Sequence, residues 1–295
     1  MKNFDEQNSF EETEFFEKVD VPFQESKEEL WANFSKKIDF DGISEKQIES
    51  KKNTKIISMI FYRVAAAVII FVTGSVFYLQ NASNTIVCKK GDHISHKLPD
   101  GSIVHLNASS TISYHPHWWY FNREVLLDGE AFFNVEKGQK FSVVSGDKIT
   151  EVLGTSFNIY AREKKYKVFC KTGKVKVSNP KIGLTILPGE LVKLDAKDVN
   201  TKVETAEENE ILSWQQYKFI YNAESLIEVF KEIERQYNTT IQLNLNSNSE
   251  YIFTGYFTKN TPLDSTIEVI SNRFNLQTIK NKNNQYIISA KYTEI

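Results

Sequence analysis

The sequence lacks the short motifs that mark several large enzyme classes. It contains no serine in a nucleophile elbow, no phosphate-binding loop and no HExxH zinc motif. Cysteine is also scarce, because Cys88 and Cys170 are the two copies in the whole chain. A disulfide between them and two separate buried thiols both remain open, since the sequence cannot give the distance between the two residues. We therefore expect no cofactor and, from these motifs, no enzyme.

Long apolar runs are almost absent, and the single exception begins more than fifty residues into the chain. Residues 56–79 read IISMIFYRVAAAVIIFVTGSVFYL, with Arg63 as the one charge. A helix crosses the hydrocarbon layer of a membrane with about 20 apolar residues. We therefore predict one transmembrane helix over residues 56–79. A cleaved signal peptide is the main alternative, but its apolar core would be shorter and closer to the N-terminus.

The charges beside this run predict its orientation. Lys46, Lys51, Lys52 and Lys55 precede the run, whereas residues 80–87 carry no charge. Positive charge is retained on the cytoplasmic side of a membrane. We therefore expect a single-pass protein of the inner membrane, with a cytoplasmic N-terminus and a periplasmic C-terminus.

The predicted cytoplasmic segment, residues 1–55, is acidic and carries an apolar stripe. Residues 1–50 hold six lysines and no arginine against fourteen acidic residues, a net charge of −8. This charge disfavours direct binding to nucleic acid. Ser26 and Glu29 form a capping box, after which Leu30, Trp31, Phe34 and Ile38 recur along one helix face. We predict that this stripe binds a protein partner, although a solvated acidic tail would have the same charge.

Two further regions follow the predicted span. Nine of the twelve glycines lie between Gly91 and Gly189, among short alternating stretches at 102–106, 124–127, 141–144, 156–160, 167–170 and 174–177. This texture predicts an all-β domain over residues 86–196, and leaves a sandwich, a barrel and a solenoid open. Residues 211–291 contain two helical patterns, each between strand-like stretches, which predicts a small α+β domain of two β-α-β repeats. The fold class is therefore multi-domain.

Four motifs follow one another along the β-rich region: LPDGSIVHLNASSTISY (98–114), VLLDGEAFFNV (125–135), VLGTSFNI (152–159) and LPGE (187–190). Together they resemble the signature of the FecR family of transmembrane anti-sigma regulators. Residues 225–238, SLIEVFKEIERQYN, and 254–270, TGYFTKNTPLDSTIEVI, resemble the small domain that often ends such chains. That domain is similar to the short signalling domain of secretins and TonB-dependent transporters.

The resemblance implies a signalling chain. The cytoplasmic segment would bind an extracytoplasmic-function sigma factor, with Leu30, Trp31, Phe34 and Ile38 as the apolar anchor. The periplasmic part would sense an outer-membrane TonB-dependent transporter, and a membrane-site protease would release the cytoplasmic segment. Candidate docking strands for the transporter are residues 217–221, which include Phe219 and Tyr221, and residues 285–289. Which sigma factor, transporter and imported compound are involved does not follow from the sequence.

One bond and two clusters have alternative interpretations. Some family members cleave their own chain at a Gly-Thr bond in this motif, which makes Gly154-Thr155 a self-cleavage candidate, whereas the ordinary interpretation is a glycine turn before a strand. The five histidines, all between His93 and His117, would suit a metal site or exposed loops. Residues 118–121, WWYF, would suit ligand stacking or a partly covered core. The alternative function is a membrane-tethered periplasmic protein that binds a glycan or another ligand.

Overall fold

The computed structural model describes residues 26–37, 54–163, 165–195, 201–245, 251–282 and 285–291. The first element, helix α2 (Lys27–Lys37), begins with the predicted capping box. The Ser26 amide donates to Glu29 Oε2 at 3.2 Å, and the Glu29 amide donates to Ser26 Oγ at 3.4 Å. These reciprocal bonds satisfy two backbone donors that an uncapped helix would leave free. No residue of α2 is buried.

Helix α3 (Thr54–Asn81) contains the apolar run. Its segment Met59–Leu79 is, among the described residues, the one helix long and apolar enough to cross a membrane by length and composition. None of that segment is buried against other parts of the chain. The prediction of a single candidate span is therefore confirmed, because a helix of this composition needs an apolar surrounding that the rest of the described chain does not provide.

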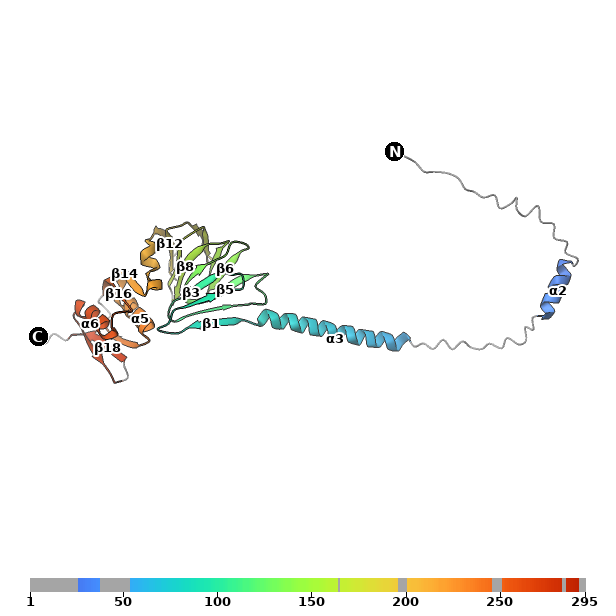
Figure 1. The fold of residues 1–295 in the computed structure, drawn as a ribbon, viewed down its shortest axis with the longest axis horizontal. Coiled ribbons are helices and arrows are strands. Elements are labelled where there is room, and N and C mark those ends of the chain that lie inside the picture. The colour runs from blue at the N-terminus through green and yellow to red at the C-terminus, as the bar shows by residue number, and fades with distance from the viewer. Residues whose placement is uncertain are drawn as a thin grey trace, which may run out of the picture. The chain divides into compact units, whose positions relative to one another are not determined.

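Within the described residues, thirteen strands form one continuous sheet that folds into two halves (Figure 1). The first half contains β1 (Asn84–Cys88), β4 (Ser110–Tyr114), the start of β5 (Arg123–Asn134), β6 (Phe141–Ser145), β7 (Lys148–Val152), β10 (Val175–Ser178) and β11 (Gly183–Ile186). The second half contains β2 (Ile94–Lys97), β3 (Ile103–Leu106), the end of β5, β8 (Ser156–Arg162), β9 (Lys165–Cys170), β12 (Glu190–Asp195) and β13 (Lys202–Thr205).

Strand β5 belongs to both halves and produces a nearly closed sheet. Its start pairs with β4 and β6, and its end pairs with β3 and β8. Gly129 lies at the crossing with φ of +115°, where a Cβ atom would approach Ser110 Oγ to 2.5 Å. No other residue fits there without displacing β4. All neighbouring strands in this sheet are antiparallel except β5 and β6, so the solenoid alternative, which needs stacked parallel coils, is wrong.

The apolar core lies between the two halves of the sheet. The alternation along the strands places Val104, Ile112, Phe133, Phe157 and Val168 there, all fully buried. The Phe133 and Phe157 rings stack with centroids 5.1 Å apart. Burying such side chains stabilises the fold by about 1.5–3 kcal/mol each, which is why the period-two pattern in the sequence identifies these strands.

The C-terminal elements form a second apolar cluster. They are α4 (Glu208–Ile211), the 3₁₀ turn η2 (Ser213–Gln216), β14 (Lys218–Ser225), α5 (Leu226–Tyr237), β15 (Thr240–Asn244), β16 (Ile252–Thr258), α6 (Leu263–Arg273), β17 (Leu276–Lys280) and β18 (Gln285–Ala290). Strand β14 pairs with β16, whereas β18 lies between β15 and β17. The prediction of residues 285–289 as a free edge is therefore wrong, because both edges of β18 are paired.

Helix α5 carries its apolar positions on one face. Leu226, Phe230 and Ile233 follow the helical period and are fully buried. The helix ends at Asn238, whose φ of +49° is the left-handed conformation that asparagine tolerates better than most residues. The opposite face of α5 meets the outer surface of the β-sheet, and this contact contains the most extensive buried polar network in the described part of the chain.

Candidate functional site

The contact between the β-sheet and the C-terminal elements has an apolar part and a polar part. The apolar part includes Phe132, which points out of the sheet at the end of β5 and packs with the C-terminal cluster around Trp214. The polar part, called the joint below, consists of five buried side chains: Asn107, Glu130, Asn158, Glu232 and Gln236. Three of these come from the β domain and two from α5, so the joint connects segments that lie at least about seventy residues apart in the sequence.

Gln236 is the centre of the joint. Its amide nitrogen donates to Asn107 Oδ1 and to Glu232 Oε1, each at 2.7 Å. Its amide oxygen lies 3.0 Å from His93 Nε2. The His93 ring also stacks on Tyr217, with centroids 4.4 Å apart. Gln236 therefore uses both ends of its amide to hold the last turn of α5 against two loops of the β-sheet.

Glu130 continues the network across the sheet. Its two carboxylate oxygens accept from Asn107 Nδ2 at 2.8 Å and from Asn158 Nδ2 at 3.0 Å. Asn158 Oδ1 in turn accepts from the Trp214 indole at 3.2 Å. Burial, and next the nearby charge of Glu232, raises the pKa of the Glu130 carboxyl. Burial therefore makes ionisation of Glu130 costly, and its two amide donors offset part of this cost.

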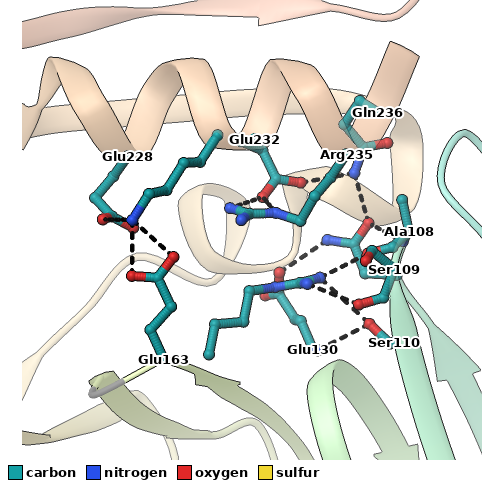
Figure 2. Close-up of polar contacts among 12 residues, drawn as sticks. Ala108, Ser109, Ser110, Glu130, Glu163, Glu228, Glu232, Arg235 and Gln236 are labelled. Atoms are coloured by element: carbon teal, nitrogen blue, oxygen red, sulfur yellow. Dashed lines mark hydrogen bonds and ion pairs between the residues drawn. The ribbon is translucent and has the colours of Figure 1, made fainter. Parts of the chain in front are cut away.

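Two arginines balance the two buried carboxylates. Arg235 donates to Glu232 Oε2 at 2.8 Å (Figure 2). Arg162 donates to the carbonyl oxygens of Ala108 and Ser109, at 2.7 and 2.8 Å. Burial opposes the charge of Glu232, but the neighbouring guanidinium groups outweigh it and hold the pKa of Glu232 below its usual range. These charged side chains are largely taken out of water, and the guanidinium of Arg235 compensates the carboxylate of Glu232 directly.

Ion pairs surround the joint at its rim. Lys231 on α5 pairs with Glu163 at 2.7 Å (Figure 2). Lys165 and Lys167 on β9 pair with Glu224 at the end of β14, at 3.1 and 3.2 Å. These side chains are partly exposed, so each pair contributes about 0–1 kcal/mol. The rim pairs therefore add little stability to the contact, whereas the buried joint holds polar groups that must stay hydrogen-bonded.

The surroundings of the joint differ from those of metal sites and of small-molecule sites. Among the described residues, no three histidine, cysteine or acidic side chains gather closely enough to hold a metal ion. A cavity of about 160 Å³ lies beside the joint, between Tyr160 and Tyr221. Cavities that bind small molecules occupy about 300–1,000 Å³. The contact is therefore suited to fixing two parts of the chain in one arrangement.

Three of the four predicted sigma-binding residues, Leu30, Trp31 and Phe34, lie on α2 and are accessible. Trp31 is 70% exposed, Leu30 and Phe34 are also exposed, and the Trp31 and Phe34 rings stack with centroids 5.9 Å apart. Ile38 lies outside the described residues. The described part of the predicted stripe is thus an apolar surface on an isolated helix, as a docking helix requires.

The two predicted transporter-binding residues point away from solvent. Phe219 is buried and stacks on Phe257 with centroids 4.8 Å apart, and Tyr221 is half-buried. Among the described residues, β14 has a single strand neighbour, β16. These two aromatic side chains are therefore not presented to a partner, and β14 is an edge strand of its two-stranded sheet.

The Gly154-Thr155 bond lies in a tight turn before β8. Gly154 has φ of +145°, and a Cβ atom there would approach the Lys137 Cα to 2.6 Å. Thr155 is buried, and its hydroxyl donates to the Lys174 carbonyl at 3.2 Å. This geometry requires glycine at position 154 and holds the threonine side chain in one orientation.

The histidines and cysteines have separate surroundings. His96 contacts the Tyr114 hydroxyl at 2.9 Å, and His105 contacts the Ser95 hydroxyl at 2.7 Å, whereas His93 belongs to the contact with Gln236. Both cysteines are buried free thiols, so of the two alternatives left open by the sequence, the separate thiols are observed.

Sequence reasoning missed the joint. Glu232 and Gln236 occupy the polar face of an amphipathic helix, which is usually solvated. A signal was nevertheless present, because Asn107, Glu130 and Asn158 lie inside three of the four motifs that carry the family resemblance. A polar residue inside an otherwise apolar strand motif indicates a buried hydrogen-bonded side chain. The motif alone does not show which residue is its partner.

Comparisons with known proteins match two parts of the chain. Residues 84–176 match the family described as FecR protein, and residues 218–288 match the family described as FecR, C-terminal. A crystal structure of a candidate anti-sigma factor from Parabacteroides distasonis ATCC 8503, at 2.50 Å resolution, is 27% identical, with a TM-score of 0.65 over 72% of this chain and 100% of that one. A second, at 1.65 Å, is 26% identical, with a TM-score of 0.64 over 71% of this chain and 100% of that one. No curated protein sequence matches.

Proposed function

The chain belongs to the FecR family of anti-sigma regulators, and on that premise we propose that it binds an extracytoplasmic-function sigma factor on one side of a membrane and receives a signal on the other. In this proposal residues 1–55 are the cytoplasmic sigma-binding segment and residues 56–79 span the inner membrane. Residues 86–196 and 211–291 form the periplasmic β domain and the C-terminal signalling domain. The lysines before the span support this orientation.

The observation that carries the sigma-binding proposal is the exposed apolar face of α2. Leu30, Trp31 and Phe34 are exposed although they are large and apolar. An 11-residue helix is too short to be stable alone, so it gains stability when this face is covered. Residues 1–50, which contain this helix, have a net charge of −8, which complements a basic partner surface. A sigma factor that covers this face would be withheld from RNA polymerase.

The periplasmic signal would come from the signalling domain of an outer-membrane TonB-dependent transporter. The edge position of β14 supports this proposal, because an extended segment of the transporter can add beside it as a further strand. Phe219 and Tyr221 would act indirectly, by holding β14 in place from the inside. The joint would then carry a pull on the C-terminal domain to the β domain.

Release of the sigma factor would follow cleavage of the chain. We assign regulated cleavage to a membrane-site protease, and we propose Gly154-Thr155 as a self-cleavage bond. The Thr155 hydroxyl oxygen would attack the Gly154 carbonyl carbon, the C–N bond between the two residues would break, and the freed Thr155 amine would take up the hydroxyl proton. Water would then hydrolyse the resulting ester and separate the two fragments. Electrophoresis of the purified full chain tests this step: two fragments that become one chain in Thr155→Ala support it, and an intact chain in both proteins contradicts it.

Capture of the partner tests the proposed function. The tagged full chain is isolated from its own cell membranes, and a bound sigma factor is identified by mass spectrometry. Trp31→Ala removes about 2 kcal/mol and weakens binding roughly thirtyfold, because a central tryptophan typically dominates an interface. Lys36→Ala, on the opposite face of α2, retains binding. Absence of a sigma factor from the wild-type capture, or its equal recovery with Trp31→Ala, would contradict the proposal.

A further inference from the structure

The loop between β4 and β5 presents aromatic side chains to the outside. Residues 115–122 read HPHWWYFN and carry no acidic or basic residue apart from two histidines. Tyr120 is 79% exposed and Phe121 is 70% exposed, and Trp118 is half-buried with its ring centroid 4.9 Å from that of Phe121. These three residues, called the aromatic loop tip below, are large apolar groups in contact with one another at the surface.

The loop that carries this tip is held rigidly. Trp119, between Trp118 and Tyr120, is 4% exposed and packs edge-on against Tyr114 and Phe141 in the core. The Trp118 amide donates to the His115 carbonyl at 3.2 Å, and the Phe121 amide donates to the Trp118 carbonyl at 3.0 Å. The outward direction of the aromatic loop tip is therefore fixed by a buried anchor.

The base of this loop contacts the residues that follow α3. Strand β1 begins at Asn84, which is paired with Tyr114, the last residue of β4. The side-chain Nδ2 of Asn84 also donates to the Tyr114 hydroxyl at 3.0 Å. His115 Nδ1 lies 3.4 Å from the carbonyl oxygen of Ala82, one residue past the end of the helix. The loop thus starts beside the point where the chain leaves α3.

Lengths along the chain place this point at the surface of a bilayer. The segment Met59–Leu79 has 21 residues and is about 31 Å long at about 1.5 Å per residue, which matches a hydrocarbon layer of about 30 Å. Ala82 lies three residues past Leu79, so it is at most about 7 Å beyond the hydrocarbon edge. The headgroup region is about 5–8 Å thick on each side. The base of the aromatic loop therefore lies at headgroup depth.

We propose that Trp118, Tyr120 and Phe121 insert into the interfacial layer of the same bilayer that α3 spans, on the side where the β domain emerges. Tryptophan and tyrosine favour this layer because their rings are apolar at one end and polar at the other. Apart from His115 and His117 the loop has no acidic or basic side chain, which lowers the cost of such insertion. The inference rests on the proposed transmembrane role of α3.

The second contact fixes the β domain against the membrane. A domain attached through Ala82 and Ser83 alone could swing about that short connection, whereas two attachment points define its tilt. A pull on the C-terminal domain would then act against a β domain that cannot simply rotate with it.

A fluorescent probe beside the tip tests the proposal in the full chain. Asn122→Cys is labelled with an NBD dye, and the protein is placed in vesicles of phosphatidylethanolamine and phosphatidylglycerol that contain a doxyl-labelled lipid. Burial raises the pKa of the native thiols Cys88 and Cys170 to about 11, so the added exposed cysteine reacts first at neutral pH. We expect the doxyl lipid to quench most of the emission at position 122.

Three matched variants separate the outcomes. Lys181→Cys, in the turn between β10 and β11 at the opposite edge of the sheet half from β1, should stay unquenched. Ile70→Cys in α3 should be quenched, which tests the span itself. The substitutions Tyr120→Ser and Phe121→Ser together should abolish quenching at position 122 without changing that at position 70.

Each other result overturns the proposal. Quenching at position 70 without quenching at position 122 leaves the span intact and removes the loop contact. No quenching at position 70 removes the span and the proposal together. Quenching at position 122 that persists in the doubly substituted loop shows that the aromatic side chains do not insert. The NBD emission at position 122 could instead shift to the blue as the protein concentration rises, without quenching by the doxyl lipid. That result assigns the aromatic loop tip to an interface between protein molecules.

Discussion

Replacing Gln236 by leucine should loosen the C-terminal domain and leave the β domain intact. Leucine has a similar volume, but it removes the three hydrogen bonds to Asn107, Glu232 and His93. Asn107 Oδ1 keeps its bond from the Ala108 amide, and Glu232 keeps its pairing with Arg235. His93 Nε2 is left without its partner.

The expected magnitude follows from these contacts. Each lost hydrogen bond contributes about 1 kcal/mol, and a buried group left unsatisfied costs about 1–3 kcal/mol. Partial retention at Asn107 and Glu232 keeps the total near 3 kcal/mol. This corresponds to an opening equilibrium constant of α5 that is about 140-fold larger, since about 1.4 kcal/mol is a factor of ten. Hydrogen exchange of α5 peptides in the full chain measures this opening.

The control is the same substitution at an exposed glutamine. Gln242 lies on β15 and makes one hydrogen bond, to Asn244 at 3.3 Å on the surface, so Gln242→Leu should change the opening free energy by less than about 0.5 kcal/mol. Equal exchange rates in the two variants, or a change of less than about 0.5 kcal/mol for Gln236→Leu, would refute the structural role assigned to the joint.

Two further predictions concern other parts of the described chain. Gly154→Ala should lower the free energy of unfolding by about 2 kcal/mol or more, because a Cβ atom there overlaps backbone; Gly146→Ala, with open space around it, should cost about 1 kcal/mol in thermal unfolding. Burial lowers the pKa of His93. Below pH ~6.5 the unfolded chain therefore binds a proton at this histidine more readily than the folded chain does, and the free energy of unfolding should fall as the pH drops below that value. His93→Gln should weaken this dependence in melting curves recorded between pH 7.5 and 5.5, whereas His117→Gln should preserve it.

The elements with strong periodic patterns could be predicted from the sequence. The apolar run gave the candidate span, and alternating stretches gave strands such as β3, β6 and β8 close to their observed bounds. The choice between sandwich and solenoid could not be made, because it depends on which strands pair. The same limit explains the error at β18, whose two neighbours, β15 and β17, include one that lies about forty residues away in the sequence.

Burial of polar residues was the other feature that the sequence concealed. Phe132 looks like one more core residue of β5, but it faces the C-terminal cluster while Phe133 faces the sheet interior. Gln236 and Glu232 look like solvated helix positions until their partners on β5 and the β3–β4 loop are known. The residues of the joint come from segments that are distant in the sequence. The motifs contain several of these residues, but the sequence alone does not show which of them hydrogen-bond to one another.

Transcription in vitro tests the central claim of this account most directly. The sigma factor captured with the chain, RNA polymerase and a promoter read by that sigma factor are combined with the full chain in lipid nanodiscs. The account predicts that the wild-type chain suppresses the transcript at equimolar amounts with the sigma factor and that Trp31→Ala restores it. Undiminished transcription with the wild-type chain, or equal suppression by Trp31→Ala, would contradict the assignment of α2 as the sigma-binding element.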